Sequence, residues 1–457
     1  MRNLREASSL LEGRELTSVE LTRQCLERIA AKNAELRAFI TVTAEQAMTD
    51  AARADAEVAE GRYRGPLHGV PVSVKDLVDV AGTPTTSGSN VPPRQPTHDA
   101  PVVANLRRAG AIVVGKTNLH EFAFGTTSDE TAFGAVRNPI DPSRSPGGSS
   151  GGAAVALVER MCYGSVGTDT GGSIRIPAAA CGVVGLKPTS GEISAEAVVP
   201  LSTTLDHVGP LALDVADAAL LYYAMLDGDA AADRVAPPAD GPLWFGVPEP
   251  YFLDKLDDDV TRLFAEARAG LTAAGHSLTD VAIAHAERTA DVYLHIVLPE
   301  SSWYHAPLLA AHADGYSPGV RLRLEMGRYV LAEDYLRATH ARTVLKKAVD
   351  RALEGLDALV LPALAIGAPP IGAASVTVGG RAEPVRAMML RLTQLFNITG
   401  HPAIALPCGR GTDGLPRSIQ LVGHRGGTAR LLAVAAAVEA GLRQITGGPG
   451  SVGGGAG

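Results

Sequence analysis

Two serine- and glycine-rich segments carry the residues best suited to chemistry. The first reads SPGGSSGG over residues 145–152 and contains Ser149, and the second reads GTDTGGSIRIP over residues 167–177 and contains Ser173. Either segment alone is typical of a loop, because Gly and Ser are common turn residues. Lys75 changes this interpretation, since a lysine whose pKa is lowered by desolvation holds a neutral amine and can serve as the base that a serine nucleophile needs. The combination indicates a serine hydrolase.

The segment that leads to the second serine has the features of an oxyanion site. Thr170, Gly171 and Gly172 come directly before it, and glycines let backbone N–H groups converge because no Cβ obstructs them. Donors arranged in this way stabilise the negative charge that develops during acyl transfer. We expect Asp169 either to fix this loop by accepting backbone N–H groups or to pair with Arg175, and both roles are structural.

These segments resemble the amidase signature family, whose members use a Ser, cis-Ser, Lys triad. The two serines are 24 residues apart and Lys75 lies 74 residues before the first, as the family pattern requires. The resemblance covers most of the first 210 residues and returns near the C-terminus. It is carried by HGVPVSVKD at 68–76, GKTNLHEFAFG at 115–125, LDHVGPLA at 205–212 and NITGHPAIALPCG at 397–409.

The resemblance implies a role for each residue of the triad. Lys75 takes a proton from Ser149, which follows a cis peptide bond and in turn deprotonates Ser173. Ser173 attacks the substrate carbonyl, backbone N–H groups of residues 170–173 hold the oxyanion, and Ser149 protonates the leaving nitrogen before water hydrolyses the acyl-enzyme. Ser150 is expected to support its loop by hydrogen bonding. The resemblance implies no metal and no cofactor.

Five further residues are candidates for the substrate pocket. Phe124, Gly125 and Thr126 match the family segment that lines the acyl pocket, and Ile176, three residues after the nucleophile, offers no charge to a carboxylate. These features favour a neutral, partly apolar acyl group. Phe124 and Ile176 are equally interpretable as core residues. Gln394 is a candidate from the C-terminal half, and its alternative interpretation is a residue on a helix surface.

Two functions remain open for such a chain. One is a stand-alone hydrolase of small amides, aryl acylamides, esters or carbamates (urethanes). The other is the glutaminase subunit of a tRNA-dependent amidotransferase, which works with partner subunits. Residues 292–342 lack the tyrosine- and serine-rich stretch of the amidotransferase subunit, so the first function is favoured. The residues do not decide between amides and carbamates.

One segment matches the sequence pattern of a phosphate-binding loop, but its residue types do not predict such a loop. Residues 110–117 read GAIVVGKT and match G-x-x-x-x-G-K-[ST]. In a phosphate loop the four variable residues follow the strand and wrap the phosphates with their N–H groups. Here those four are Ala111, Ile112, Val113 and Val114, which are typical of the strand itself, so no loop remains. We expect Lys116 to be a structural or a solvated residue.

The elements that must position these residues alternate between helix and strand. This pattern predicts an α/β fold with a single mixed, twisted central sheet and helices on both faces. A capping-box pattern at Thr17 and Glu20 predicts an early helix, and strands are expected at 69–80, 111–114, 358–361 and 403–406. We expect one domain over residues 1–457. Its parts are a catalytic core at 1–227, a surface linker at 228–242, a mostly helical cap at 243–353, a return to the sheet at 354–446 and a flexible tail at 447–457.

The composition limits the partners of the protein. A net charge of −8 without a Lys/Arg block gives no footprint for nucleic acid or an anionic membrane. The four cysteines have no metal-ligand spacing, and His295, His305 and His312 fit no helical ligand pair, so these histidines are expected at the surface or at a pocket rim. No apolar run is long enough for a secretory or membrane segment. We expect a cytoplasmic enzyme that acts on a small molecule as a monomer or homodimer.

Overall fold

The computed structural model describes residues 3–228 and 237–446. Its centre is an eleven-stranded sheet in the order β1-β3-β2-β4-β6-β5-β12-β13-β9-β7-β8, and β10 and β11 form a separate hairpin. The expected tail at 447–457 and residues 229–236 of the expected linker lie outside the described residues. The strands are β1 (Phe39–Val42), β2 (Pro71–Lys75), β3 (Ile112–Thr117), β4 (Gly164–Asp169), β5 (Val184–Lys187), β6 (His207–Ala212), β7 (Trp244–Glu249), β8 (Ser277–Ala282), β9 (Ala358–Pro362), β10 (Ser375–Val378), β11 (Arg381–Pro384), β12 (Ala403–Arg410) and β13 (Pro416–Val422).

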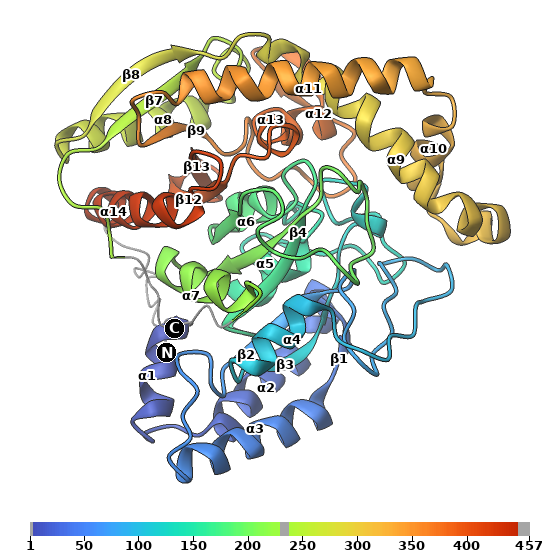
Figure 1. Cartoon of the computed structure of the whole chain (residues 1–457), viewed down its shortest axis with the longest axis vertical. Helices are drawn as coiled ribbons and strands as arrows, with labels where there is room; N and C mark the ends of the chain where they lie inside the picture. Colours follow the sequence, from blue (N-terminus) through green and yellow to red (C-terminus); the bar gives the residue numbers. More distant parts are fainter. Residues whose placement is uncertain (1–2, 229–236, 447–457) are drawn as a thin grey trace.

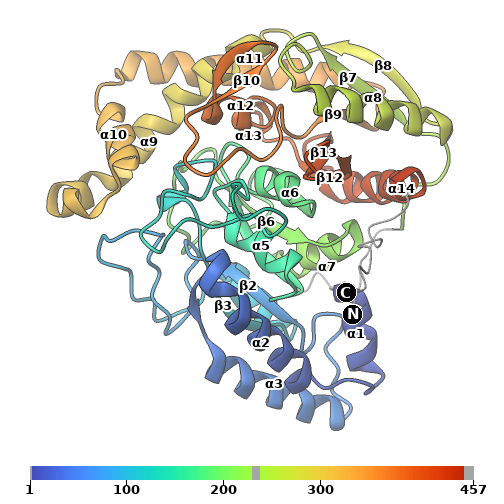
Figure 2. The same cartoon turned by 180° about the vertical axis from the view of Figure 1, so that it is seen from behind.

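Helices cover the sheet on both sides. Helices α4 and α7 lie in front of it in Figure 1, and α5 and α6 lie in front of it when the molecule is seen from behind in Figure 2. The predicted α/β fold with one mixed sheet is therefore confirmed. The helices are α1 (Leu4–Glu12), α2 (Ser18–Leu36), α3 (Ala44–Ala59), α4 (Pro101–Arg108), α5 (Gly151–Val158), α6 (Arg175–Cys181), α7 (Val215–Met225), α8 (Asp258–Ala273), α9 (Thr289–His312), α10 (Pro318–Gly327), α11 (Ala332–Ala352), α12 (Val385–Leu390), α13 (Gln394–Ile398) and α14 (Thr428–Thr446).

The sheet joins segments that are far apart in the sequence. Strand β2 runs parallel to both β3 and β4, whereas β12 from the C-terminal half pairs antiparallel with β5 from the first half. The expected strands near residues 358 and 403 are β9 and β12. The region 243–353, expected to be a mostly helical cap, contains the helices α8, α9, α10 and α11, and it also supplies β7 and β8 to the far end of the same sheet.

The strand that carries Lys75 is shorter than predicted. Strand β2 ends at Lys75, after which a turn bonds Val78 N to the carbonyl of Lys75. The valines at 78 and 80 make only isolated bridges, to Val198 and Thr83. Alternation of β-branched residues therefore extends past the true end of the strand, and the side chain of Lys75 projects from its C-terminal end, where active sites of α/β sheets commonly lie.

Strand β3 excludes a phosphate loop at residues 110–117. The strand continues through Gly115 and Lys116 to Thr117, so even the two residues expected to turn the chain are part of the sheet. Lys116 is completely buried and its Nζ lies 2.8 Å from Asp76 Oδ1. It is a structural residue, and the alternative of a solvated lysine is wrong.

The N-terminal capping box forms as predicted. The Thr17 side chain accepts from Glu20 N, and the Glu20 side chain accepts from Thr17 N, at the start of α2. This helix is the second of the chain, because α1 precedes it and begins at an Asn3 N-cap. The amphipathic pattern of Leu21, Cys25 and Ile29 corresponds to the buried face of α2.

Candidate active site

Strand pairing brings Lys75 to the segment that contains Ser173. Strands β2 and β4 are parallel neighbours, with Val74 level with Val166, so the C-terminal ends of both strands meet at one edge of the sheet. Lys75 is the last residue of β2, and the chain that leaves β4 at Asp169 reaches Ser173 four residues later. Lys75 is completely buried and Ser173 is 4% exposed to solvent.

The amine of Lys75 is held by hydroxyl groups. Its Nζ lies 2.8 Å from Ser149 Oγ and 2.8 Å from Thr168 Oγ1. Burial lowers the pKa of Lys75 to about 7, against the opposing effect of the carboxylates of Asp169 and Asp206. No carboxylate forms an ion pair with this amine among residues 3–228 and 237–446, so a substantial fraction of it is neutral near pH 7.

Ser149 is fixed by its backbone rather than by its side chain alone. The peptide bond between Gly148 and Ser149 is cis, as the resemblance implies. The Ser149 carbonyl accepts from His120 N at 3.1 Å and from Ser128 Oγ at 3.2 Å. These bonds leave the hydroxyl directed at Lys75.

The two serine loops meet through their backbones. Ser150 N donates to the carbonyl of Ser173 at 3.2 Å, and Ser150 Oγ donates to the carbonyl of Thr168 at 3.2 Å. The expected supporting role of Ser150 is confirmed. The hydroxyl of Ser173 makes no hydrogen bond within the described part of the chain, and the two serine loops are joined through Ser150.

The turn between β4 and α6 presents a row of free donors. The backbone N–H groups of Thr170, Gly171, Gly172 and Ser173 donate no hydrogen bond to any described residue. Buried backbone N–H groups are nearly always paired in folded proteins. Four consecutive free donors beside a serine are therefore suited to an oxyanion.

Close packing explains why two of these residues are glycines. A Cβ on Gly172, whose φ is +140°, would lie 2.3 Å from Thr393 Oγ1, and a Cβ on Gly171 would lie 2.7 Å from Tyr293 Oη. Thr393 Oγ1 also donates to the carbonyl of Gly171 at 2.5 Å. Residues of the C-terminal half and of the cap thus pack directly against the turn.

A buried ion pair stabilises the same turn. Arg175 Nη2 lies 2.9 Å from Asp169 Oδ1, and Asp169 Oδ2 accepts from Ile174 N at 3.2 Å. Burial opposes ionisation of Asp169, but the adjacent guanidinium outweighs it and holds the pKa of the carboxyl below its usual range. Both structural roles expected for Asp169 are therefore confirmed. Arg175 also donates to Asn397 Oδ1 and Gln420 Oε1, each at 2.6 Å.

A second buried carboxyl holds the first residue of the turn. Asp206 Oδ1 accepts from Thr170 Oγ1 at 2.5 Å, and its oxygens also accept from the backbone N–H groups of Leu201 and Ser202. Burial raises the pKa of Asp206 to about 6. Ser202 in turn donates to Glu300 of α9 at 2.5 Å, so this network joins the cap to the turn.

The predicted pocket segment at residues 124–126 is buried. Phe124 is completely buried, and the guanidinium carbons of Arg323 and Arg386 lie 5.4 and 5.5 Å from the centre of its ring. Arg386 Nη1 also donates to the Phe124 carbonyl at 3.1 Å. Gly125 leaves room for His120, because a Cβ there would lie 2.0 Å from His120 Nε2. Thr126 is buried.

The other two pocket candidates are also buried. Ile176 packs against the glycines of both serine loops, since its side chain lies 3.1 Å from a Cβ built on Gly147 and 2.8 Å from one built on Gly172. Gln394 is the first residue of α13 and only 5% exposed, so its interpretation as a helix-surface residue is wrong. Helix α13 is a short inner helix and has no solvent face at this position.

Several residues of the site were missed by sequence reasoning. Asp206 and Asn397 lie inside motifs that carry the resemblance, so their segments were recognised but their roles were not. Thr168 could have been found from its position on β4. Thr393 and Arg386 gave no signal in the sequence, because only the tertiary fold brings α12 and α13 to the turn.

The described residues contain no group of three or more His, Cys, Asp or Glu side chains placed to hold a metal ion. Of the three cap histidines, His305 is completely buried and its Nδ1 lies 3.0 Å from Tyr316 Oη, so its expected place at the surface or rim is wrong. None of the helices in the described ranges is both long and apolar enough to cross a membrane.

Comparisons with known proteins show which proteins this chain is similar to. A family model described as Amidase matches residues 20–432. An amidase of Pseudomonas putida is 38% identical over 90% of this chain and 90% of its own length. A glutamyl-tRNA(Gln) amidotransferase subunit from Chloroflexus aurantiacus is 34% identical over 95% of each chain. A crystal structure of an amidase superposes with a TM-score of 0.91 at 38% identity, covering 96% of this chain and 99% of that one.

Proposed function

The chain belongs to the amidase family of hydrolases that act on amides, and from this premise we propose that it is a stand-alone hydrolase that cleaves small amides through an acyl-enzyme on Ser173. The observation that carries the proposal is the buried amine of Lys75, which contacts the Ser149 hydroxyl and, among the residues that the structure describes, no carboxylate. A neutral amine in that position can accept a proton, whereas an ion-paired ammonium cannot.

In the first half of the reaction, the Lys75 amine accepts the Ser149 proton while Ser149 accepts the proton of Ser173. The Ser173 oxygen attacks the carbonyl carbon, and the carbonyl oxygen becomes an oxyanion that the free N–H groups of residues 170–173 stabilise. The C–N bond breaks as Ser149 gives a proton to the departing nitrogen and takes its own proton back from Lys75, so the amine of Lys75 is neutral again. The amine leaves and the acyl group stays on Ser173.

In the second half, water replaces the amine. Ser149 and Lys75 take a proton from the water, whose oxygen attacks the ester carbonyl, and the proton finally returns to Ser173 as the acid departs. The sum is one amide and one water converted to one acid and one amine. A carbamate would react at the same carbonyl and give an alcohol, an amine and carbon dioxide, so urethanes belong to the proposed substrates together with aryl acylamides and esters.

The proposed acyl pocket uses Phe124, Gly125, Thr126, Ile176 and Gln394. Phe124 and Ile176 support a small, neutral and partly apolar acyl group. The guanidinium of Arg386 lies beside Phe124 and would favour a carboxylate if it faced the bound acyl group. A substrate panel that pairs an acyl group ending in a carboxylate with its neutral analogue therefore tests the proposed pocket. Preference for the neutral analogue is expected.

The alternative is a glutaminase subunit that requires partners, and relatives of that kind are also similar to this chain. The two functions separate when the purified chain alone is assayed on nitroanilides, carbamates and glutamine. Turnover of nitroanilides or carbamates without partners supports the stand-alone enzyme. Turnover of glutamine only, and only with partner subunits added, would overturn it.

Ser173→Ala is the direct test of the nucleophile. We expect kcat/KM on the best substrate to fall by at least about 1000-fold, because residues that act as one catalytic unit each remove most of its effect. Ser9→Ala is the matched control, since Ser9 is exposed on α1. Activity of Ser173→Ala within tenfold of the parent would remove Ser173 from the mechanism.

The proposal includes a reducing compartment, the cytoplasm, and a monomer or homodimer. All four cysteines, Cys25, Cys162, Cys181 and Cys408, are buried free thiols, which supports a compartment in which thiols stay reduced. Size-exclusion chromatography with light scattering measures the oligomeric state, and an assembly larger than two chains would contradict this part.

A further inference from the structure

A cavity outside the active site is lined mainly by cations and hydroxyl groups. It has a volume of about 440 Å³ and lies between α11 and the loops near residues 189, 399 and 425. Its side chains include those of Arg342, Lys346 and Arg425, together with the hydroxyl-bearing Thr189, Ser190 and Thr399. Arg342 and Lys346 are four residues apart on α11, so they lie on one face of the helix.

Lys346 has no partner in this cavity. Its side-chain amine makes no hydrogen bond and no ion pair with any residue in the described ranges. Burial lowers its pKa, and the neighbouring Arg342 and Arg425 lower it further, against a smaller opposing effect of Asp350. Lys346 is therefore a half-buried amine held among like charges, which costs free energy unless an anion is bound.

The other charges around the cavity do not cancel this excess. Asp350 forms two hydrogen bonds with Arg425, at 2.8 and 3.0 Å, so that carboxylate is already engaged. Arg342 donates through Nε to the Ile398 carbonyl and through Nη2 to the Thr204 carbonyl, which leaves its Nη1 free. Glu300 of α9 favours the charged form of Arg342 from outside the cavity lining. Among the described residues no carboxylate is bonded to Arg342 or Lys346, so donors remain on both.

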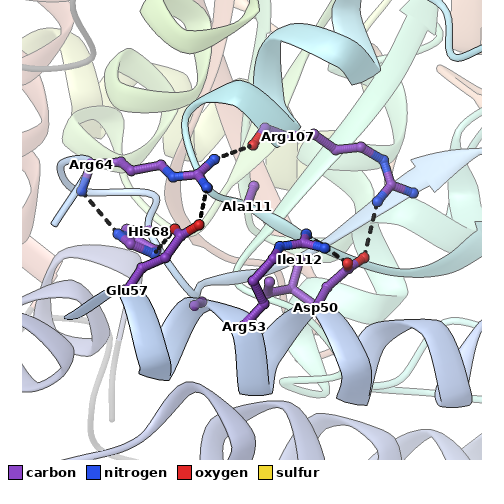
Figure 3. Close-up of a pocket in the computed structure, with 10 residues that line it drawn as sticks. Asp50, Arg53, Glu57, Arg64, His68, Arg107, Ala111 and Ile112 are labelled. Atoms are coloured by element: carbon purple, nitrogen blue, oxygen red, sulfur yellow. Dashed lines mark hydrogen bonds and ion pairs between the residues drawn. The ribbon is translucent and has the colours of Figure 1, made fainter. Parts of the chain in front are cut away.

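A second charged pocket, near the N-terminal helices, provides a contrast (Figure 3). It is much smaller, at about 20 Å³, and every cation drawn there faces a carboxylate. Asp50 pairs with Arg53 at 2.7 Å and with Arg107 at 3.0 Å, and Glu57 pairs with Arg64. Unpaired positive charge is thus a property of the α11 cavity and not of every arginine-rich surface of this protein.

We propose that the cavity beside α11 is a binding site for a small multivalent oxyanion, such as phosphate or a phosphomonoester. Free N–H donors on Arg342 and Lys346 would bind its oxygens directly, and the exposed Ser190 hydroxyl lies at the same cavity. Guanidinium and ammonium donors form charge-assisted hydrogen bonds with phosphate oxygens, which are stronger than neutral ones.

Isothermal titration of the full chain with inorganic phosphate tests the site, at an ionic strength held constant with sodium chloride. One saturable site per chain is expected. Lys346→Gln should weaken the affinity at least about tenfold, because it removes one charge-assisted contact. Lys347→Gln is the matched control, because Lys347 is the exposed neighbour of Lys346 and the substitution removes the same charge. The phosphate affinity of this variant should equal that of the parent.

Three outcomes would overturn the proposal. These are the absence of saturable phosphate binding to the parent chain, an equal loss of affinity in Lys346→Gln and Lys347→Gln, and acetate binding as tightly as phosphate. Lys346→Arg keeps the charge and should retain affinity within a few fold, so it separates loss of the contact from damage to the helix. None of these readouts depends on the hydrolase activity.

Discussion

Two lysines on neighbouring strands have opposite surroundings. Lys75 on β2 and Lys116 on β3 are both completely buried, and the strands are parallel partners. The Nζ of Lys116 lies 2.8 Å from Asp76 Oδ1, whereas within the described part of the chain the hydrogen-bond partners of Lys75 Nζ are the hydroxyls of Ser149 and Thr168. Both lysines are buried, but the nearest acceptor is a carboxylate for Lys116 and a hydroxyl for Lys75.

The difference depends on where one carboxylate points. Asp76 follows Lys75 in the sequence, yet its oxygens pair with Lys116 and with the hydroxyl of Thr86. A carboxylate beside Lys75 would favour its charged form and remove the base. Asp76 is the carboxylate nearest to Lys75 in the sequence. Because Asp76 pairs with Lys116, it does not stabilise the protonated form of Lys75. A buried lysine becomes a base when the surrounding fold withholds an anion from it.

The largest effect is expected from Lys75→Met. Removing the amine should lower kcat/KM by at least about 1000-fold, because Ser149 and Ser173 then lose their proton acceptor. Steady-state kinetics on a nitroanilide measure the loss, and an unchanged circular dichroism spectrum shows that the chain is folded. The exposed Lys32→Met is the control and should keep full activity. A tenth of the parent activity in Lys75→Met would exclude Lys75 as the base.

Lys116→Met should affect stability rather than chemistry. The change leaves Asp76 buried without its cation, and breaking a buried pair in this way costs about 3–5 kcal/mol of unfolding free energy. Urea denaturation measures the cost. Adding Asp76→Asn to Lys116→Met should recover part of the loss, because the stranded charge is gone. If Lys75→Met lowers the unfolding free energy as much as Lys116→Met does, the carboxylate partner of Lys116 does not explain a difference between the two lysines.

The pH dependence of the parent enzyme reports the charge state of Lys75. Burial lowers the pKa of Lys75 to about 7, and only the neutral amine accepts a proton. The rate constant kcat/KM should therefore rise with pH through about 7, and below that pH it should fall by about tenfold for each unit. Kinetics across the acid and neutral range measure the limb. A limb near the usual carboxylate range would indicate a different base.

The smallest effect is expected from Asp206→Asn. The carboxylate of Asp206 raises the pKa of Lys75, opposing burial, so its removal should move the acid limb of kcat/KM to lower pH by a fraction of a unit. Asp206 also faces Thr170 on the turn, the backbone N–H groups of residues 201 and 202, and Glu300 and Tyr293 on α9. The asparagine oxygen can still accept from Thr170, so kcat at high pH should fall only a few fold.

Asp291→Asn is the control for this small shift, because Asp291 is exposed on α9. Its pH profile should coincide with that of the parent. An acid limb of Asp206→Asn that stays in place, or moves to higher pH, would show that Asp206 does not act on Lys75 through its charge.

Much of the architecture could be predicted from the sequence. Alternating helix and strand patterns indicated the mixed sheet, and apolar runs located β3, β9 and β12. The extent of β2 could not be predicted, because the valines after Lys75 fit a strand as well as they fit buried isolated bridges. The alternative interpretation of Gln394 as a helix-surface residue was wrong for a related reason, since a five-residue helix carries too short a pattern to reveal which faces are buried.

The chemical residues could be located, but their supports could not. Serines in glycine-rich loops and a lysine on a strand have recognisable local signatures. The contacts that hold the turn join residues far apart in the chain. Arg175 and Gln420 are separated by 245 positions, and Thr393 and Gly171 by 222. No local pattern encodes such pairs, because they arise only when the sheet is assembled.

The insertion of β12 beside β5 has a consequence for how the chain is made. During translation the first half leaves the ribosome before its C-terminal partner exists, so the backbone groups at the edge of β5 have no strand to bond. An open strand edge is a template for association with other chains. Fragments that stop before Ala403 should therefore need chaperones or aggregate, and co-expression of the missing piece should rescue them.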